Sequence, residues 1–90
     1  MLNELFEIIE ARKRERPQGS YTAELLSGGE DEILKKVGEE AMEVILAAKG
    51  QGKQRLVEET ADLFYHVLVM LAYKNLTLTD IDDELRRRHR

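Results

Sequence analysis

Apolar residues recur every three or four positions along most of this chain, which is the spacing of one face of an α-helix. Leu2, Leu5 and Ile9 follow this spacing in the first such segment. Alternation typical of a strand is too short to predict one. The pattern therefore predicts an all-α fold. Its four expected helices cover residues 2–14, about 28–49, about 53–75, and a last segment that opens near residue 77.

Residues that interrupt helices mark the expected boundaries. Pro17 is the only proline, and it ends the first helix because it disfavours helical geometry at the residue before it. Residues 18–29 are rich in glycine, serine and threonine, so we expect them to be irregular. Glycines within residues 50–52 are typical of a helix C-terminus.

Two residue pairs have capping-box spacing, in which two polar side chains satisfy free backbone N–H groups at a helix start. Ser27 and Glu30 form one pair, and Thr77 and Asp80 form the other. They predict the starts of the second and fourth helices.

Residues 63–72 of the third expected helix are apolar on almost all sides and are interrupted chiefly by His66. A helix of this kind is buried on most of its faces. A chain of 90 residues buries only about 60–65% of its surface on folding, too little to cover such a helix alone. We therefore expect a single domain, residues 1–90, whose four-helix-bundle-like core is completed by homodimerisation.

Composition narrows the function classes. The chain has no cysteine, so it forms no disulfides and no thiolate metal sites. No apolar run resembles a signal peptide or approaches the ~20 residues of a membrane span, so we expect a cytoplasmic protein without a membrane partner. The formal net charge of −4 argues against binding nucleic acid. The basic residues at 86–90 instead complement the dipole of a last helix.

Acidic residues form stripes on the second and third expected helices. Glu39, Glu40 and Glu43 fall within an arc of about 100° on a helix, and Glu59 and Asp62 lie at i, i+3. If the two helices are neighbours, four of these five carboxylates meet across a short gap, and their mutual repulsion requires a cation. Oxygen ligands of this kind suit Mg²⁺, which often shares its coordination shell with substrate phosphates.

A solvated helix surface is the simpler interpretation of these charges. Lys35 and Lys36 have the spacing to pair with Glu39 and Glu40. Asp62 argues against this reading, because it directly precedes the apolar stretch, where a carboxylate is costly unless it is paired or metal-bound.

Two further groups of residues could contact a substrate. His66, four residues after Asp62, could be a hydrogen-bonded core residue, could orient the Asp62 carboxylate, could contact substrate, or could itself be a metal ligand; the first three are favoured over the last. Ser20, Tyr21 and Thr22 offer hydroxyl groups and a ring that suit phosphate or ribose, although a loop tyrosine is as often a packing residue.

Three motifs carry a resemblance to a known family. They are GSYTAxL at 19–25, KKVGEEAxE at 35–43 and ExxDLxYH at 59–66. With them, the sequence resembles the phosphoribosyl-ATP pyrophosphatases, members of the all-α MazG-like nucleoside-triphosphate pyrophosphohydrolase superfamily. The acidic pattern is common to the superfamily, whereas the first motif separates this family from the others.

The resemblance implies a homodimer that hydrolyses phosphoribosyl-ATP to phosphoribosyl-AMP and pyrophosphate, the second step of histidine biosynthesis. Some relatives carry a cyclohydrolase domain with cysteine zinc ligands, which this cysteine-free chain lacks, so it looks monofunctional. Together, residues and resemblance assign Mg²⁺ to Glu40, Glu43, Glu59 and Asp62. Glu39 would orient or deprotonate the attacking water, with Glu40 and Glu43 also catalytic through the metal. Substrate contacts would come from Ser20, Tyr21, Thr22, Lys35, Lys36 and His66.

Two other functions remain open at this point. A general nucleoside-triphosphate pyrophosphohydrolase would use the same acids without needing a tuned segment at 19–25. A non-catalytic helical dimerisation or adaptor module would leave the acids as solvated surface.

Overall fold

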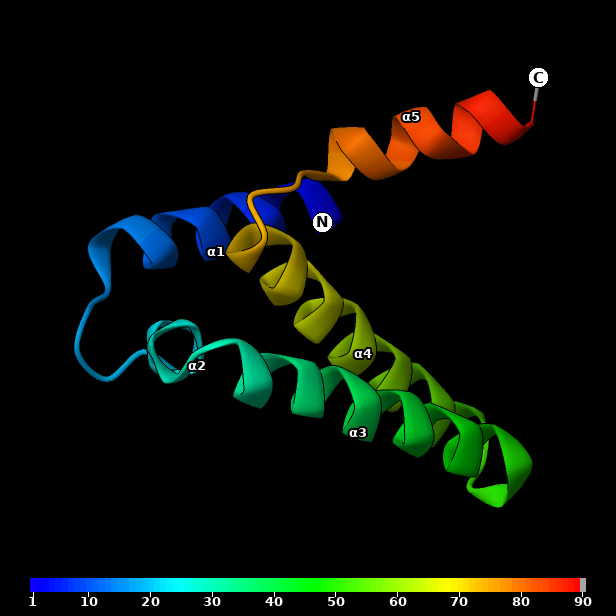
Figure 1. The fold of residues 1–90 in the computed structure, drawn as a ribbon. Helices are drawn as coiled ribbons and strands as arrows, with labels where there is room; N and C mark the ends of the chain where they lie inside the picture. The colour runs from blue at the N-terminus through cyan, green and yellow to red at the C-terminus, as the bar shows by residue number, and fades with distance from the viewer. Residues whose placement is uncertain (90) are drawn as a thin grey trace.

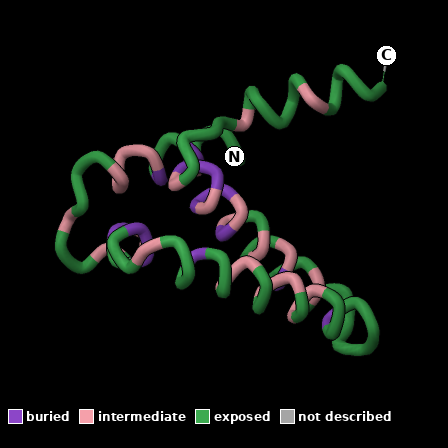
Figure 2. The backbone as a smooth tube through the Cα atoms, in the orientation of Figure 1, coloured by how far each residue is buried: buried purple, intermediate pink, exposed green. Residues whose placement is uncertain are grey.

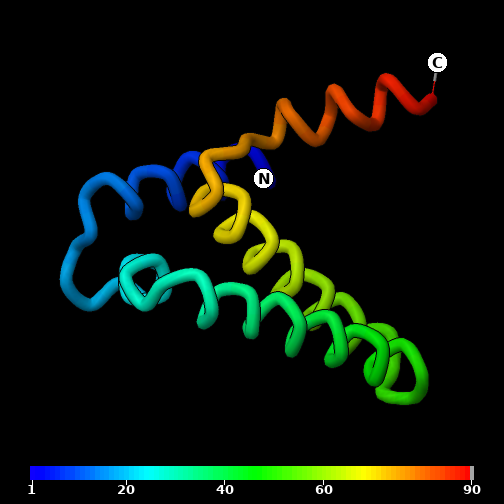
Figure 3. The backbone as a smooth tube through the Cα atoms, viewed as in Figure 1, coloured from blue at the N-terminus to red at the C-terminus, as the bar shows by residue number. Residues whose placement is uncertain are grey.

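The computed structural model describes residues 1–89 and contains five α-helices, with no strand among these residues (Figure 1). The helices are α1 (Leu2–Glu15), α2 (Tyr21–Gly28), α3 (Glu30–Gly50), α4 (Lys53–Tyr73) and α5 (Leu78–Arg88). The two long helices, α3 and α4, form an antiparallel hairpin whose turn lies far from both termini (Figure 3). The all-α prediction is confirmed, but the expected number of four helices is wrong.

The additional helix is α2, in the segment expected to be irregular. Ser20 is its N-cap, and the Ser20 hydroxyl accepts a hydrogen bond from the backbone N–H of Ala23 at 3.1 Å. An isolated helix of eight residues is unstable in water, so α2 depends on packing. Ala23, Leu25 and Leu26 supply it, since all three are buried. Ser20, one of the polar residues that suggested a loop, is in fact the cap of a short helix.

One of the two predicted capping boxes forms. At the start of α5, Asp80 N–H donates to Thr77 Oγ1 (3.2 Å) and Thr77 N–H donates to Asp80 Oδ2 (2.9 Å). The box predicted from Ser27 is wrong, because Gly29, with a φ of 97°, is the N-cap of α3 and no side chain caps it. The Ser27 hydroxyl instead accepts a hydrogen bond from Arg16 Nη1 at 2.9 Å.

The core lies where the C-terminal half of α4 meets α1, α2 and the start of α3 (Figure 2). Ile9, Ile33 and Val69 are the largest fully buried side chains. Lys13 of α1 donates to the Ala72 carbonyl at 2.7 Å, so it caps the end of α4 and holds the two helices together. The described helices include none that is both long enough and apolar enough to cross a membrane.

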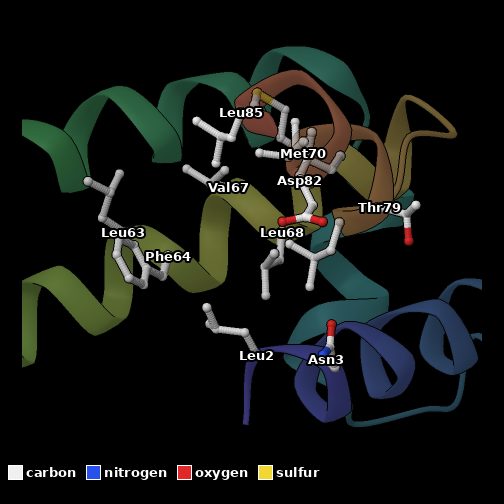
Figure 4. Close-up of a pocket in the computed structure, with 13 residues that line it drawn as sticks. Leu2, Asn3, Leu63, Phe64, Val67, Leu68, Met70, Thr79, Asp82 and Leu85 are labelled. Atoms are coloured by element: carbon white, nitrogen blue, oxygen red, sulfur yellow. The ribbon is translucent and has the colours of Figure 1, made fainter. Parts of the chain in front are cut away.

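One side of α4 is not covered within the chain. Phe64 is 49% exposed, and Leu63, Val67 and Met70 are only partly buried. These side chains line a groove of about 930 Å³ together with residues of α1 and α5 (Figure 4). The apolar stretch at 63–72 is therefore only half buried by its own chain, because α5 stands away from the hairpin (Figure 1).

Candidate active site

The antiparallel pairing of α3 and α4 brings acidic residues from both helices together. Carboxylate oxygens of Glu40, Glu59 and Asp62 lie within 4.8 Å of one another. Glu59 is buried, the Glu40 side chain is 13% exposed, and Asp62 is exposed. Three carboxylates at this separation repel one another strongly unless a cation lies between or beside them.

The three carboxylates open onto a hollow of about 490 Å³. The residues that line it are Lys36, Glu39, Glu40, Met42, Glu43, Arg55, Glu59 and Asp62. Glu39 and Glu43 thus border the hollow without belonging to the group of three. Three oxygen donors on one side of an open hollow fit Mg²⁺, which keeps several positions for water and phosphate oxygens.

Burial within the group differs from what the sequence suggested. Asp62 precedes the apolar stretch but faces solvent, whereas Glu59, one turn earlier, is only 4% exposed. Folding therefore desolvates the Glu59 carboxylate and leaves that of Asp62 in water. Such a buried carboxylate requires a partner, because leaving a buried charge unpaired costs about 3–5 kcal/mol.

Lys36 is the cation on the α3 side of the hollow. Its Nζ lies 3.6 Å from Glu40 Oε1 and 3.8 Å from Glu39 Oε1. Burial lowers the pKa of Lys36, but the neighbouring Tyr21 hydroxyl and the Glu40 and Glu39 carboxylates outweigh it, so this pKa is raised above its usual value. Lys36 therefore stays protonated beside the acids. Lys35 is exposed and lies outside the residues that line the hollow.

Arg55 is the cation on the α4 side, and the sequence analysis did not identify it. Its Nη2 lies 2.7 Å from Glu59 Oε1, and its Nη1 donates to Glu58 Oε1 at 3.1 Å. The i, i+4 spacing of Arg55 and Glu59 could have indicated this pair. Its importance comes from the burial of Glu59, which spacing alone does not predict.

His66 is buried and contacts the main chain of Asp62, not its carboxylate. Its Nδ1 lies 2.7 Å from the Asp62 carbonyl oxygen, which can only accept, so Nδ1 carries the proton. In the neutral ring, Nε2 then accepts from the Tyr21 hydroxyl, 3.3 Å away. His66 thus links the start of α2 to the acidic part of α4.

The other residues of the 20–22 segment are also held in place. Thr22 hydrogen-bonds with the Tyr65 hydroxyl, and burial raises the pKa of Tyr65. The rings of Tyr21 and Tyr65 stack with centroids 6.3 Å apart. Of the two rings, Tyr21 is the more accessible, at 51% exposure. Tyr65 had no predicted role, although it lies within the 59–66 motif.

Comparisons with known proteins agree on one family. The family model described as phosphoribosyl-ATP pyrophosphohydrolase matches residues 2–89. The chain is 52% identical over 88 residues to a phosphoribosyl-ATP pyrophosphatase of Metallosphaera sedula, covering 98% of this chain and 95% of that protein. It is 54% identical over 88 residues to one of Nitrosospira multiformis, covering 98% of this chain and 73% of the other. It is also 51% identical over 90 residues to a histidine biosynthesis bifunctional protein of Caldanaerobacter subterraneus, of which it spans 44%.

Proposed function

Because this chain belongs to the phosphoribosyl-ATP pyrophosphohydrolase family, we propose that the hollow between α3 and α4 is its active site. The chain is a phosphoribosyl-ATP pyrophosphatase of histidine biosynthesis, as its resemblance predicted. The observation that supports the location of the site is the convergence of Glu40, Glu59 and Asp62 from two helices.

We propose that Mg²⁺ is the cofactor and that Glu40, Glu59 and Asp62 hold it, with Glu43 at the border of the hollow as a further ligand. The oxygen-only donor set supports this metal over one that prefers nitrogen or sulfur. When bound, Mg²⁺ supplies charge neutralisation at the polyphosphate and lowers the pKa of a bound water.

The side chains around the acids have separate tasks in this proposal. Water attacks a phosphorus in line, its proton passes to Glu39, and the bridging oxygen between the α and β phosphates leaves with one product. Lys36 donates to phosphate oxygens, since it is protonated and borders the hollow. Lys35 contacts the outer part of the polyphosphate from its exposed position. The products are phosphoribosyl-AMP and pyrophosphate.

The phosphoribosyl end of the substrate would lie along residues 20–22. Tyr21 is half exposed and lies near enough to Lys36 to raise its pKa, which supports a path from the acids to this segment. Ser20 and Thr22 shape the segment through their hydrogen bonds to Ala23 and Tyr65. His66, being buried, contributes by fixing Tyr21.

We also propose a homodimer in which a second copy covers the groove beside α4. The groove is mostly apolar, and Phe64 and Leu85 at its border are 49% and 52% exposed. An exposed apolar surface of this extent is typical of an interface.

Two substitutions of Phe64 test this interface. Phe64→Asp should give a monomer in multi-angle light scattering, whereas Phe64→Leu should keep the dimer. If both variants are dimeric, this interface is contradicted. One domain over residues 1–90 and a cytoplasmic location remain predictions.

A steady-state assay tests the function directly. Pyrophosphate release from phosphoribosyl-ATP should require Mg²⁺ and should exceed release from ATP and other nucleoside triphosphates by orders of magnitude in kcat/KM. Equal rates across the nucleotides would instead indicate a general pyrophosphohydrolase. No release from any of them would indicate a helical adaptor.

A further inference from the structure

Each of two carboxylates in the acidic group already has a side-chain cation. Lys36 pairs with Glu40 from α3, and Arg55 pairs with Glu59 from α4. Among residues 1–89, Arg55 is the cation within ion-pair distance of Glu59. A metal that binds the group therefore shares the buried Glu59 carboxylate with Arg55 or displaces Arg55 from it.

The two members of this pair differ in exposure. The Glu59 side chain is 5% exposed, whereas the Arg55 side chain is 51% exposed. The carboxylate is held by its surroundings, but the guanidinium lies on a long flexible stem at the border of the hollow. Its second contact, to exposed Glu58, is with a solvated group and holds it weakly. Arg55 can thus leave Glu59 without disturbing the core.

Binding of Mg²⁺ and substrate would change the charges that surround Arg55. Five acidic and two basic side chains line the hollow, so it is negative without metal, which favours Mg²⁺ and disfavours a polyphosphate that arrives without a cation. If Mg²⁺ takes the place of Arg55 at Glu59, the guanidinium would be free to face the phosphate oxygens of a substrate in the hollow. A planar guanidinium donates two parallel hydrogen bonds to a phosphate, which an ammonium group does not.

We propose that Arg55 has two successive partners: it neutralises Glu59 in the metal-free enzyme and binds the pyrophosphate portion of the substrate when Mg²⁺ takes its place. This inference depends on the proposed position of the active site. It makes Arg55 a substrate-binding residue, and it gives the buried Glu59 carboxylate a partner in the metal-free site.

Removing Arg55 should change metal and anion affinity in opposite directions. In Arg55→Ala, Mg²⁺ alone should bind about 3–10-fold more tightly, because a competitor is gone and Glu59 is left uncompensated. Pyrophosphate, titrated at micromolar concentration in excess Mg²⁺, should bind about 10–100-fold more weakly, because charge-assisted hydrogen bonds are lost. Isothermal titration calorimetry of the full chain measures both without turnover.

Two further variants separate this role from general electrostatics. Lys53→Ala removes the same charge two residues earlier on the same exposed turn and should leave both affinities within about twofold. Arg55→Lys keeps the charge but not the planar fork, so Mg²⁺ affinity should stay near wild type while pyrophosphate binding stays weakened.

Unchanged pyrophosphate affinity in Arg55→Ala, or weakening of both ligands together, would overturn the proposal. The second outcome would mean that Arg55 only supports the structure of the site. Failure of the proposed function is a different result: the wild-type chain would then release no pyrophosphate from phosphoribosyl-ATP, whatever the affinities of Arg55→Ala for Mg²⁺ and pyrophosphate.

Discussion

The N-terminal half of α4 lines the candidate site, whereas its C-terminal half forms part of the core. Residues 53–62 present Arg55, Glu59 and Asp62 to an open hollow that they share with α3. Residues 63–73 include Leu68 and other buried side chains that form the core with α1, α2 and the start of α3. One straight helix therefore anchors the fold at one end and carries charge at the other. The acidic group can tolerate its repulsion because the opposite end of the same helix supplies the packing.

The largest effect that separates the halves is expected from Asp62→Asn. The substitution removes a carboxylate that faces solvent, so folding should be preserved while metal binding is lost. Turnover of phosphoribosyl-ATP should fall by about 10³-fold. Steady-state kinetics with helical circular dichroism as the folding control measures this, and turnover within tenfold of wild type would remove Asp62 from the metal site.

Leu68→Ala, in the core half of α4, should lower stability and leave turnover nearly unchanged. Leu68 is 4% exposed, so its truncation should lower the free energy of unfolding by about 2–5 kcal/mol. Urea denaturation measures this loss. Because Leu68 lies outside the hollow, kcat of the folded fraction at low temperature should stay within about twofold, and a parallel loss of kcat would mean that the halves are coupled.

Magnesium itself should stabilise the acidic half. A site present only in the folded chain adds about 2.7 kcal/mol at a hundredfold excess over Kd. The melting temperature should therefore rise with Mg²⁺ concentration in the wild type and stay constant in Asp62→Asn. Chelation should reverse the rise, and a wild-type melting temperature that ignores millimolar Mg²⁺ would argue against the metal.

The smallest effect is expected from Tyr21→Phe. Tyr21 lies on α2, and its hydroxyl contacts His66 near the point where the two halves of α4 meet. This change removes the hydroxyl that hydrogen-bonds to His66 and keeps the ring. A single hydrogen bond contributes about 0.5–1.5 kcal/mol, so KM should rise several-fold with little change in kcat. Tyr73→Phe, at a partly buried tyrosine of the core half, is the control and should leave KM unchanged.

Local rules account for what could be predicted. The Thr77 capping box, the glycine turn between the long helices and the acidic stripes all depend on residues a few positions apart. They follow from helix geometry, whatever the rest of the chain does. Helix α2 escaped prediction because Gly19 and Ser20 resemble a loop, and only contacts of Leu25 and Leu26 with other helices make the segment helical.

The candidate site also has some features that local sequence rules predict and others that they do not. Periodicity alone placed Glu40 on one stripe and Glu59 on another, because positions three or four apart share a helix face. Only the tertiary structure decided that Glu59 is the buried acid, that Arg55 is its partner, and that His66 contacts Tyr21. Burial and cross-helix contact depend on which faces pack together. That choice is made by the whole chain, since a residue's solvent exposure is a property of its neighbours in space and not of its neighbours in sequence.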